Sequence, residues 1–493
     1  MRSKNTEMDS RIAAAREGDS AVSTAAVAGR RSSSRVWRAL LAGPPVSEPP
    51  GAPRGVMSSP ASACEEAAAR ADAPAPPGPD CRECLVPGRP QRAQWVLASA
   101  AAAAECSLFA MVVLVAPVLA CEQSAGAWGT VASFVAWLGG VAVGAGVWGS
   151  VADARGRAFA VRGSAVYAVL GAVLCALAPS YHLWLVCLWL SGVGSGGSSV
   201  TRVLLVEWLP ARARARYLFS STACGVGGYL SILALAQLLP GITGDWRILC
   251  VAAAAANAVV AWLAWTACRE SLPSLLARAQ VEDARATVAE LAAAGNYAGA
   301  LAVESVPLQS TAPQRGAACT VLRRQDVASL IVLWSLAASA RAIETVFAEG
   351  QVVVRGAGCG AGHGDLALLW CSELLGYLLL LLFSKRFASL WTPACFFLVA
   401  CGATLARLAP GAELPVRIMA PALLVGAQQS IFLLAAESCG AATRGRILGA
   451  AMSLVAIICG CAIVASAPAE VVRGDVTLAQ VCVRHLRFAP PFV

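Results

Sequence analysis

Charged residues are scarce in this 493-residue chain, where they make up 14% of the positions against 58% for hydrophobic residues. A soluble globular domain carries about 25% charged residues, so this composition excludes an ordinary soluble protein. Lysine is nearly absent, with only Lys4 and Lys385, and arginine therefore carries almost all of the positive side of the +9 net charge. Because the arginines lie between apolar runs, they indicate membrane topology and no nucleic-acid partner.

The signatures of enzymes are also missing. The sequence has no G-x4-G-K-[ST] phosphate loop, which argues against an ATP-driven pump, and no Ser/His/Asp constellation. Cys81-x-x-Cys84 has no second pair at zinc-ligand spacing, and most of the 19 cysteines lie inside apolar runs, where they act as small hydrophobes. We therefore expect no catalytic residue, no metal site, no cofactor and no enzymatic activity.

Long apolar runs dominate the chain after Trp95. A run of about 18 or more apolar residues can span a bilayer as a helix. The runs predict eleven spanning helices, at about 95–120, 126–148, 159–178, 182–206, 217–240, 246–267, 327–348, 365–383, 391–409, 414–436 and 446–467. The fold class is thus all-α and polytopic.

Composition divides the chain into five segments. Residues 1–94 are rich in Ala, Pro, Ser, Gly and Arg, without an apolar signal-peptide core, and predict a disordered tail. Apolar positions at helical spacing from Arg269 to Asn296 predict amphipathic helices on the membrane face. The expected segments are the tail 1–94, a six-helix bundle 95–267, a central loop 268–326, a second bundle 327–467 and a tail 468–493.

The distribution of arginine predicts the orientation. Basic residues concentrate in alternate loops, which cytoplasmic loops do in multi-pass proteins. These loops carry Arg155, Arg157 and Arg162, then Arg212, Arg214 and Arg216, then Lys385 and Arg386, then Arg444 and Arg446. We therefore expect the N-terminus and the central loop to be cytoplasmic.

An internal repeat relates the two bundles. Glu207-x6-Arg214-x-Arg216 follows the fourth run, and Glu437-x6-Arg444-x-Arg446 follows the tenth. The same spacing at corresponding positions favours a duplicated six-helix unit. The pattern ends early, because no run after Ala467 is long enough for a twelfth helix, which we expect to be missing or degraded.

The segment between the second and third runs carries a distinctive string, Gly149-x3-Asp153-x-Arg155-Gly156-Arg157. Arginines near Asp153 can bind its carboxylate or helix-end carbonyls, and glycines allow close helix approach. We favour a charge-pair latch that closes a cytoplasmic gate over arginines that only fix topology. The residues expected in this gate are Gly149, Asp153, Arg155, Gly156, Arg157, Glu207, Arg214, Glu437 and Arg444.

This string resembles the signature loop of major facilitator superfamily transporters. Other segments of the sequence are similar to the synaptic-vesicle-two-related (SVOP-like) branch of this superfamily. They are Gln94-Trp95, Ala116-Pro117, Cys121-Glu122, Gly192–Gly197, Glu207–Arg216, Asp245-Trp246-Arg247, Glu270-Ser271, Trp370, Glu373 and Thr443-Arg444. The resemblance implies two rocking six-helix bundles around a central solute site. The chain departs from the branch at Leu188, where the branch has Arg, at Leu108, where it has an acid, and in the second-half signature loop.

Ionisable residues inside the predicted spans are the best binding-site candidates, because such groups are costly in a membrane and face a cavity or a partner. Glu105 and Arg202 lie within the first and fourth runs, and Arg341 and Glu344 lie three residues apart in the seventh. The alternatives are snorkelling of Arg202 toward Glu207 and a structural ion pair for Arg341 and Glu344.

Two hypotheses follow from the sequence. The first is a monomeric secondary transporter that moves a small, charged organic solute by alternating access, coupled to a proton or other ion, in the lipid of the plasma membrane or of an intracellular vesicle. The second is a non-transporting membrane scaffold or vesicle protein derived from the same fold, which Leu108, Leu188 and the early end of the repeat favour.

Overall fold

We describe a computed structural model of the chain over residues 88–122, 126–238, 245–293, 332, 362–383 and 413–464. All of these residues belong to one compact unit, Pro60–Val493. Within the described ranges every regular element is a helix, which confirms the all-α class. Seven helices in this part of the chain are long and apolar enough to cross a membrane, so the protein is a multi-pass membrane protein.

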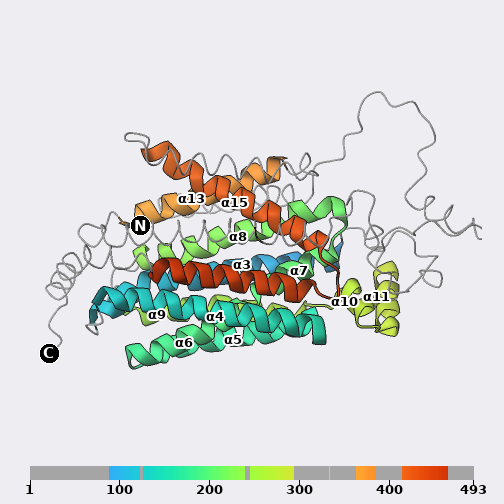
Figure 1. Cartoon of the computed structure of the whole chain (residues 1–493), viewed down its shortest axis with the longest axis horizontal. Coiled ribbons are helices and arrows are strands. Elements are labelled where there is room, and N and C mark those ends of the chain that lie inside the picture. The colour runs from blue at the N-terminus through green and yellow to red at the C-terminus, as the bar shows by residue number, and fades with distance from the viewer. Residues whose placement is uncertain are drawn as a thin grey trace, which may run out of the picture. The chain divides into compact units, whose positions relative to one another are not determined.

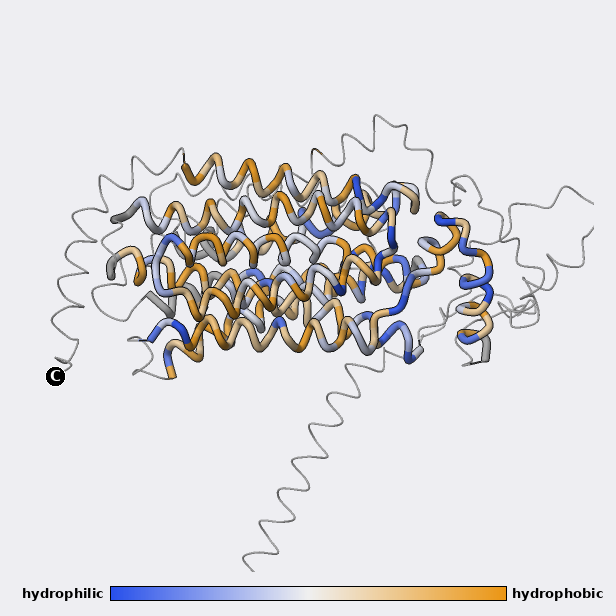
Figure 2. The backbone as a smooth tube through the Cα atoms, turned by 90° about the horizontal axis from the view of Figure 1, so that it is seen from below, coloured by the Kyte–Doolittle hydropathy of each residue, from blue (hydrophilic) through white to orange (hydrophobic). Residues whose placement is uncertain are grey.

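The helices of the first half pack side by side (Figure 1). Their residue patterns are continuous apolar runs with polar ends, as Figure 2 shows for the described chain. The predicted runs up to residue 267 all correspond to helices. These are α3 (Arg89–Glu122), α4 (Gly126–Arg155), α5 (Arg157–Leu177), α6 (Tyr181–Ser195), α7 (Ser198–Trp208), α8 (Ala211–Leu238) and α9 (Arg247–Thr266).

Three helices of the second half are described. They are α13 (Gly362–Phe383), α15 (Glu413–Ser438) and the Arg444–Val464 helix. They correspond to the predicted runs 365–383, 414–436 and 446–467. The predicted spans 327–348 and 391–409, and the question of a twelfth helix, lie outside the described residues.

Two helix boundaries differ from the sequence prediction. α3 begins at Arg89 instead of near 95, because Gln91 and Gln94 are buried and the Gln94 side-chain amide donates a 2.8 Å hydrogen bond to the carbonyl of Ala267. α4 continues through Asp153 to Arg155, so the signature string that we expected as a loop is helical except for the turn at Gly156.

The expected fourth helix is divided. α6 ends at Ser195 and α7 begins at Ser198, with Gly196 and Gly197 between them. A Cβ atom built at Gly196 would lie 2.3 Å from the backbone nitrogen of Ala145 in α4. The glycines therefore serve close helix packing.

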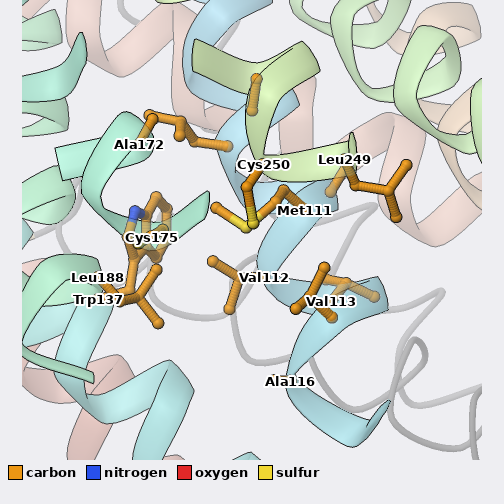
Figure 3. Packing of buried hydrophobic residues seen from close by; sticks show 14 of the residues in the cluster. Met111, Val112, Val113, Ala116, Trp137, Ala172, Cys175, Leu188, Leu249 and Cys250 are labelled. Atoms are coloured by element: carbon orange, nitrogen blue, oxygen red, sulfur yellow. The ribbon is translucent and has the colours of Figure 1, made fainter. Parts of the chain in front are cut away.

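The core of the first half is apolar and draws residues from α3, α4, α5, α6, α8 and α9. Met111, Val112 and Val113 of α3 face Ala172 and Cys175 of α5 and residues of α6 and α9 (Figure 3). Leu108 and Leu188, the two positions at which the chain departs from the SVOP-like branch, are fully buried. These two apolar residues fit the core and leave no charge in it.

Two short helices follow the first half, α10 (Leu272–Ala277) and α11 (Val281–Ala293). Leu272, Leu275, Val288 and Leu291 are buried in one cluster with residues of α5, α7 and α9. The predicted amphipathic helices therefore exist, and their apolar faces pack against the end of the bundle.

Candidate functional site

Asp153, near the C-terminus of α4, binds the second half through its carboxylate. Its Oδ1 and Oδ2 atoms accept hydrogen bonds from the backbone N–H groups of Gly445 (3.0 Å) and Arg446 (2.7 Å). These N–H groups lie in the first turn of the Arg444–Val464 helix, where a negative charge is favoured. Asp153 thus caps a helix of the opposite half, and its side chain is fully buried.

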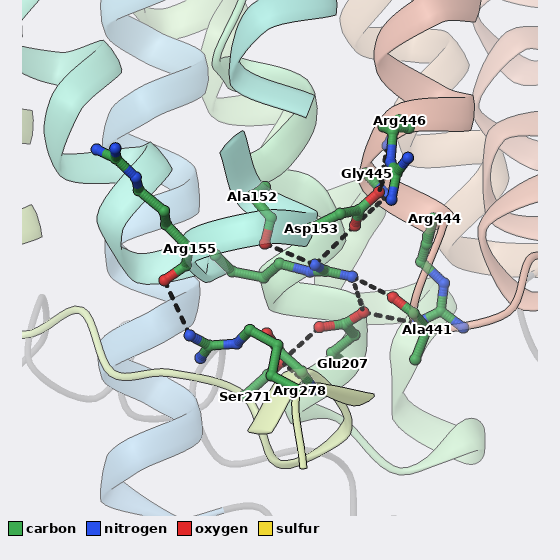
Figure 4. A network of polar contacts seen from close by, with 12 residues as sticks. Ala152, Asp153, Arg155, Glu207, Ser271, Arg278, Ala441, Arg444, Gly445 and Arg446 are labelled. Carbon is green, nitrogen blue, oxygen red and sulfur yellow. Dashed lines mark hydrogen bonds and ion pairs between the residues drawn. The ribbon is translucent and has the colours of Figure 1, made fainter. Parts of the chain in front are cut away.

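Arg157 lies next to this cap, and Glu207 lies beside it (Figure 4). The Arg157 guanidinium forms an ion pair with Asp153 (2.8 Å) and a longer contact with Glu207 (3.5 Å), and it donates to the carbonyl of Ala152 (2.8 Å). It also donates a hydrogen bond to the carbonyl of Ala441, across the two halves. All three charged side chains are at most 1% exposed, so their charges depend on one another for compensation.

The two copies of the Glu-x6-Arg repeat bind each other reciprocally, through one ion pair in each direction. Arg444 of the second half binds Glu207 of the first at 2.8 Å, and Arg214 of the first half binds Glu437 of the second at 3.1 Å. Each of these arginines also donates to the backbone carbonyl five residues before it, Arg214 to Leu209 and Arg444 to Cys439. We call Asp153, Arg157, Glu207, Arg214, Glu437 and Arg444 the interhalf network.

Residues of the central stretch support the interhalf network. The Glu270 carboxylate accepts from the backbone N–H groups of Arg157 (2.9 Å) and Ala158 (3.1 Å), and thereby caps the N-terminus of α5. Ser271 donates a hydrogen bond to Glu207. Gly156 precedes α5 with φ of 112°, and a Cβ there would lie 2.3 Å from Glu270, so the turn requires glycine.

Glycines bring the two halves into backbone contact beside the interhalf network. A Cβ at Gly149 of α4 would lie 2.4 Å from the carbonyl oxygen of Gly445, and a Cβ at Gly449 would lie 2.4 Å from that of Ala145. Ser453 donates to the carbonyl of Ala142 at 2.6 Å further along the same crossing. The halves therefore meet without a gap at this end, which we call the network end.

Two cysteines lie at the network end outside the spanning helices. Burial raises the pKa of the Cys268 thiol to about 12, although nearby Arg162 opposes the shift. Burial also raises the pKa of the Cys439 thiol, with Arg444 acting in the opposite direction. Both groups are therefore neutral thiols at physiological pH, and thiols react slowly in that form.

Glu105 and Arg202 form a second ionic contact, between α3 and α7, in the middle of the spans. Their side chains approach to 3.5 Å, and Arg202 also donates to the Ser198 hydroxyl at 3.0 Å. The guanidinium lies 5.6 Å from the ring centroid of Phe432 on α15. Glu105 is 21% exposed and Arg202 13%, unlike the buried carboxylates at the network end.

The structure thus brings most of the predicted site residues into two groups. Arg202, for which snorkelling toward Glu207 was the alternative, binds Glu105 in this structure. Arg155 is exposed and contributes only its backbone carbonyl, which accepts from Arg278. Arg341 and Glu344 lie outside the described residues.

The sequence analysis did not identify Glu270, Ser271 and Arg446 as parts of the site. Arg446 contacts Asp153 through its backbone N–H and, at 3.6 Å, through its side chain. Its place in the Glu-x6-Arg-x-Arg repeat was the only signal for it. Glu270 and Ser271 are among the residues that resemble the SVOP-like branch, but nothing in their spacing indicates contact with α5 or Glu207.

Comparisons with solved structures identify this arrangement of helices. Over about four fifths of the chain it matches the E. coli proton:xylose symporter XylE (TM-score 0.57, 14% identity, 81% of this chain and 96% of that one). It also matches the human organic anion transporter TETRAN (TM-score 0.56, 12% identity, 80% and 97%). The family model described as "Sugar (and other) transporter" matches residues 96–337.

The fold, and the sequence of the first half, are thus similar to those of major facilitator superfamily transporters. Members of that superfamily are transporters, which supports the expectation that the protein is not an enzyme. Among curated proteins, the chain is similar to the synaptic vesicle 2-related protein of Rattus norvegicus, at 28% identity over 166 residues. It is also similar to that of Bos taurus, at 26% identity over 137 residues.

These matches support the predicted resemblance to the SVOP-like branch. They cover 33% and 28% of this chain, and only 30% and 25% of the rat and bovine proteins. The activity of those whole proteins is therefore carried over only as a proposal.

Proposed function

We propose that this protein is a secondary transporter that moves a small organic solute by alternating access. The observation that carries the proposal is the reciprocal pairing of Arg214 with Glu437 and of Arg444 with Glu207, at an end where backbones of the two halves touch. A protein whose two halves never separate has no need of reciprocal ion pairs between them. Two bundles that rock against each other need a contact that holds them together in the closed state and that breaks as a unit when they separate.

The interhalf network acts as a latch in this proposal. Separating the halves would leave Asp153 without its two N–H donors and Glu207 without Arg444. Water would replace these partners only once the network end has opened, so opening is all-or-none. The arrangement described here is thus the state closed at the network end, and we assign that end to the cytoplasm with the N-terminus, following the arginine distribution.

Glu105 and Arg202 would contact the solute or a coupling ion. Both side chains are partly exposed in mid-span. Besides binding Glu105, Arg202 donates hydrogen bonds only to the carbonyl and hydroxyl oxygens of Ser198 among the described residues. A charged solute that binds either member would loosen their contact with each other. Arg202 also contacts the ring of Phe432 in the second half. Solute binding at Arg202 would therefore change a contact between the two halves.

The first experiment measures both ends of the molecule at once by pulsed electron-spin distance measurements, with encoded spin labels that leave the native cysteines untouched. One label pair, at exposed Ala154 and Thr443, reports on the network end. The other pair, at exposed Leu238 and Val464, reports on the opposite ends of their helices. E207Q should lengthen the first distance and shorten the second.

A fixed scaffold would respond differently. It would show one distance at each end in the parent chain and in E207Q alike, and that outcome would refute alternating access. Labels placed within one half, at Ala154 and Leu177, serve as the control and should keep a constant distance.

A further inference from the structure

Five aromatic rings from both halves meet in the middle of the described helices. Phe109 of α3 lies at the centre, with ring centroids 5.5 to 6.3 Å from those of its four neighbours. Tyr229 of α8 and Trp370 of α13 are stacked on each other, with centroids 4.0 Å apart and planes inclined by 18°. We call Phe109, Phe134, Trp137, Tyr229 and Trp370 the aromatic cluster.

The aromatic cluster adjoins the mid-span ion pair. Glu105 and Phe109 are four residues apart on α3, so they lie on the same face, one helical turn from each other. α3 starts at the network end, so the ring of Phe109 lies on the side of Glu105 away from the interhalf network. A solute at Glu105 is thus bounded by the charge network on one side and by aromatic rings on the other.

The indole N–H group of Trp137 is a free donor within the aromatic cluster. The side chain of Trp137 is 7% exposed, and its Nε1–H has no hydrogen-bond partner in the described structure. A buried donor without an acceptor costs about 1–3 kcal/mol, and an acceptor oxygen on a bound solute would remove that cost. Trp148, also on α4, shows the usual arrangement, since its Nε1 donates to the carbonyl of Val193 at 3.0 Å.

We propose that the aromatic cluster is the binding subsite for an organic ammonium cation that also carries a hydroxyl or carbonyl oxygen. Ring faces carry negative electrostatic potential and attract ammonium groups in low-dielectric surroundings. The Glu105 carboxylate, one turn away, adds a second attraction for positive charge. The solute oxygen would accept the hydrogen bond of Trp137 Nε1.

The stacked pair explains how such a subsite can be closed when empty. Tyr229 belongs to the first half and Trp370 to the second, so their stack covers ring faces only while the halves are together at this level. The cation binds when Trp370 moves off the face of Tyr229 and leaves that face free. The inference rests on the proposed transport function, since a fixed scaffold would never expose these faces.

Binding to the purified full-length chain in lipid nanodiscs tests the proposal. The probes are choline, its acetyl ester, and 3,3-dimethylbutan-1-ol, which has the shape of choline without the charge. We expect choline or its ester to bind at least about tenfold more tightly than the uncharged analogue, as a desolvated cation–π contact implies. Binding of the uncharged analogue at equal strength, or of neither cation, would overturn the proposal.

Two variants separate a ligand-binding role from a packing role. W137F removes the N–H group while keeping an aromatic ring, so affinity should fall about fivefold with one lost hydrogen bond in a protein that remains folded at the temperature of the assay. F109L should weaken cation binding by about tenfold or more, whereas F159L, a ring outside the cluster, should not. Unchanged affinity in both W137F and F109L would show that the aromatic cluster only packs.

The spin-label distances distinguish failure of this inference from failure of the proposed function. If E207Q still lengthens the distance at the network end and shortens the distance at the opposite end, but no cation binds, the protein is a transporter for another class of solute. If the distances are fixed as well, both proposals fall.

Discussion

The interhalf network and the Glu105–Arg202 pair are both built from carboxylates and arginines, but their surroundings differ. Asp153 and Glu207 are fully buried, and each accepts at least two contacts from the opposite half or from neighbouring helices. Glu105 is 21% exposed and reaches Arg202 at 3.5 Å. The first arrangement can be broken only as a whole, whereas the second can exchange a partner for a solute.

This difference has an energetic basis. Removing one member of a buried, multiply bonded ion pair costs about 3–5 kcal/mol, because the remaining charge stays buried without compensation. Exposed pairs contribute only about 0–1 kcal/mol. We therefore expect variants of the interhalf network to change the conformation of the protein, and variants of the mid-span pair to change what it binds.

Replacement of Glu207 should have the largest effect. E207Q leaves Arg157 and Arg444 without their shared counter-charge, which destabilises the state closed at the network end by about 3–5 kcal/mol. Opening would expose Cys439 and remove the burial that raises the pKa of its thiol, so more of it would be thiolate at pH 7.5. Maleimide labelling of Cys439, quantified by peptide mass spectrometry, should rise by more than about tenfold.

The control for this prediction is E290Q. Glu290 pairs with Arg269, but both side chains are more than half exposed, at 64% and 60%. Labelling of Cys439 in E290Q should match the parent chain, and a similar rise in both variants would show that labelling reports general unfolding.

Glycine replacement should open the network end without any change of charge. G449A would place a Cβ 2.4 Å from the carbonyl oxygen of Ala145, which forces α4 and the Arg444–Val464 helix apart. We expect faster Cys439 labelling, by a smaller factor than in E207Q, because the ion pairs can partly follow the shift. G460A lies on the same helix with nothing within 4 Å of its Cβ, so it should label like the parent.

The reciprocal pair Arg214–Glu437 should contribute less than Glu207. Glu437 is 32% exposed, so solvent can compensate Arg214 when the carboxylate is removed. E437Q should raise Cys439 labelling by about twofold to fivefold, which corresponds to about 1 kcal/mol or less. The charge-exchanged double variant R214E/E437R should restore slow labelling, and a further increase would show that the pair does not act as an isolated contact.

Replacement of Glu105 in the mid-span pair should have the smallest effect on conformation and should abolish transport. E105Q should leave Cys439 labelling unchanged, because Glu105 touches no member of the interhalf network in the described structure. Solute accumulation in vesicles, surveyed by mass spectrometry against chain-free vesicles, should be lost while surface expression is kept. Unchanged accumulation would remove Glu105 from the solute site, and an absence of accumulation in the parent chain would favour the scaffold hypothesis.

Much of the fold was determined by the sequence alone. Apolar runs of spanning length give helices because a bilayer leaves backbone groups no other partner, so composition and run length predicted α3 to α9, α13 and α15. The duplicated Glu-x6-Arg-x-Arg spacing predicted that Glu207 and Glu437 occupy equivalent places. Mid-span charges predicted Glu105 and Arg202, because a membrane makes an idle charge expensive.

The tertiary structure decided which of these residues meet. The sequence suggested a charge-pair latch that includes Asp153 and residues of both halves, but only the crossing of α4 with the Arg444–Val464 helix places the Asp153 carboxylate on the N–H groups of Gly445 and Arg446. The aromatic cluster draws one ring each from α3, α8 and α13 and two from α4, with no common spacing to reveal it. Local pattern fixes which face of a helix is apolar, whereas contacts between residues hundreds of positions apart depend on how the two halves pack, and no short window of sequence contains that information.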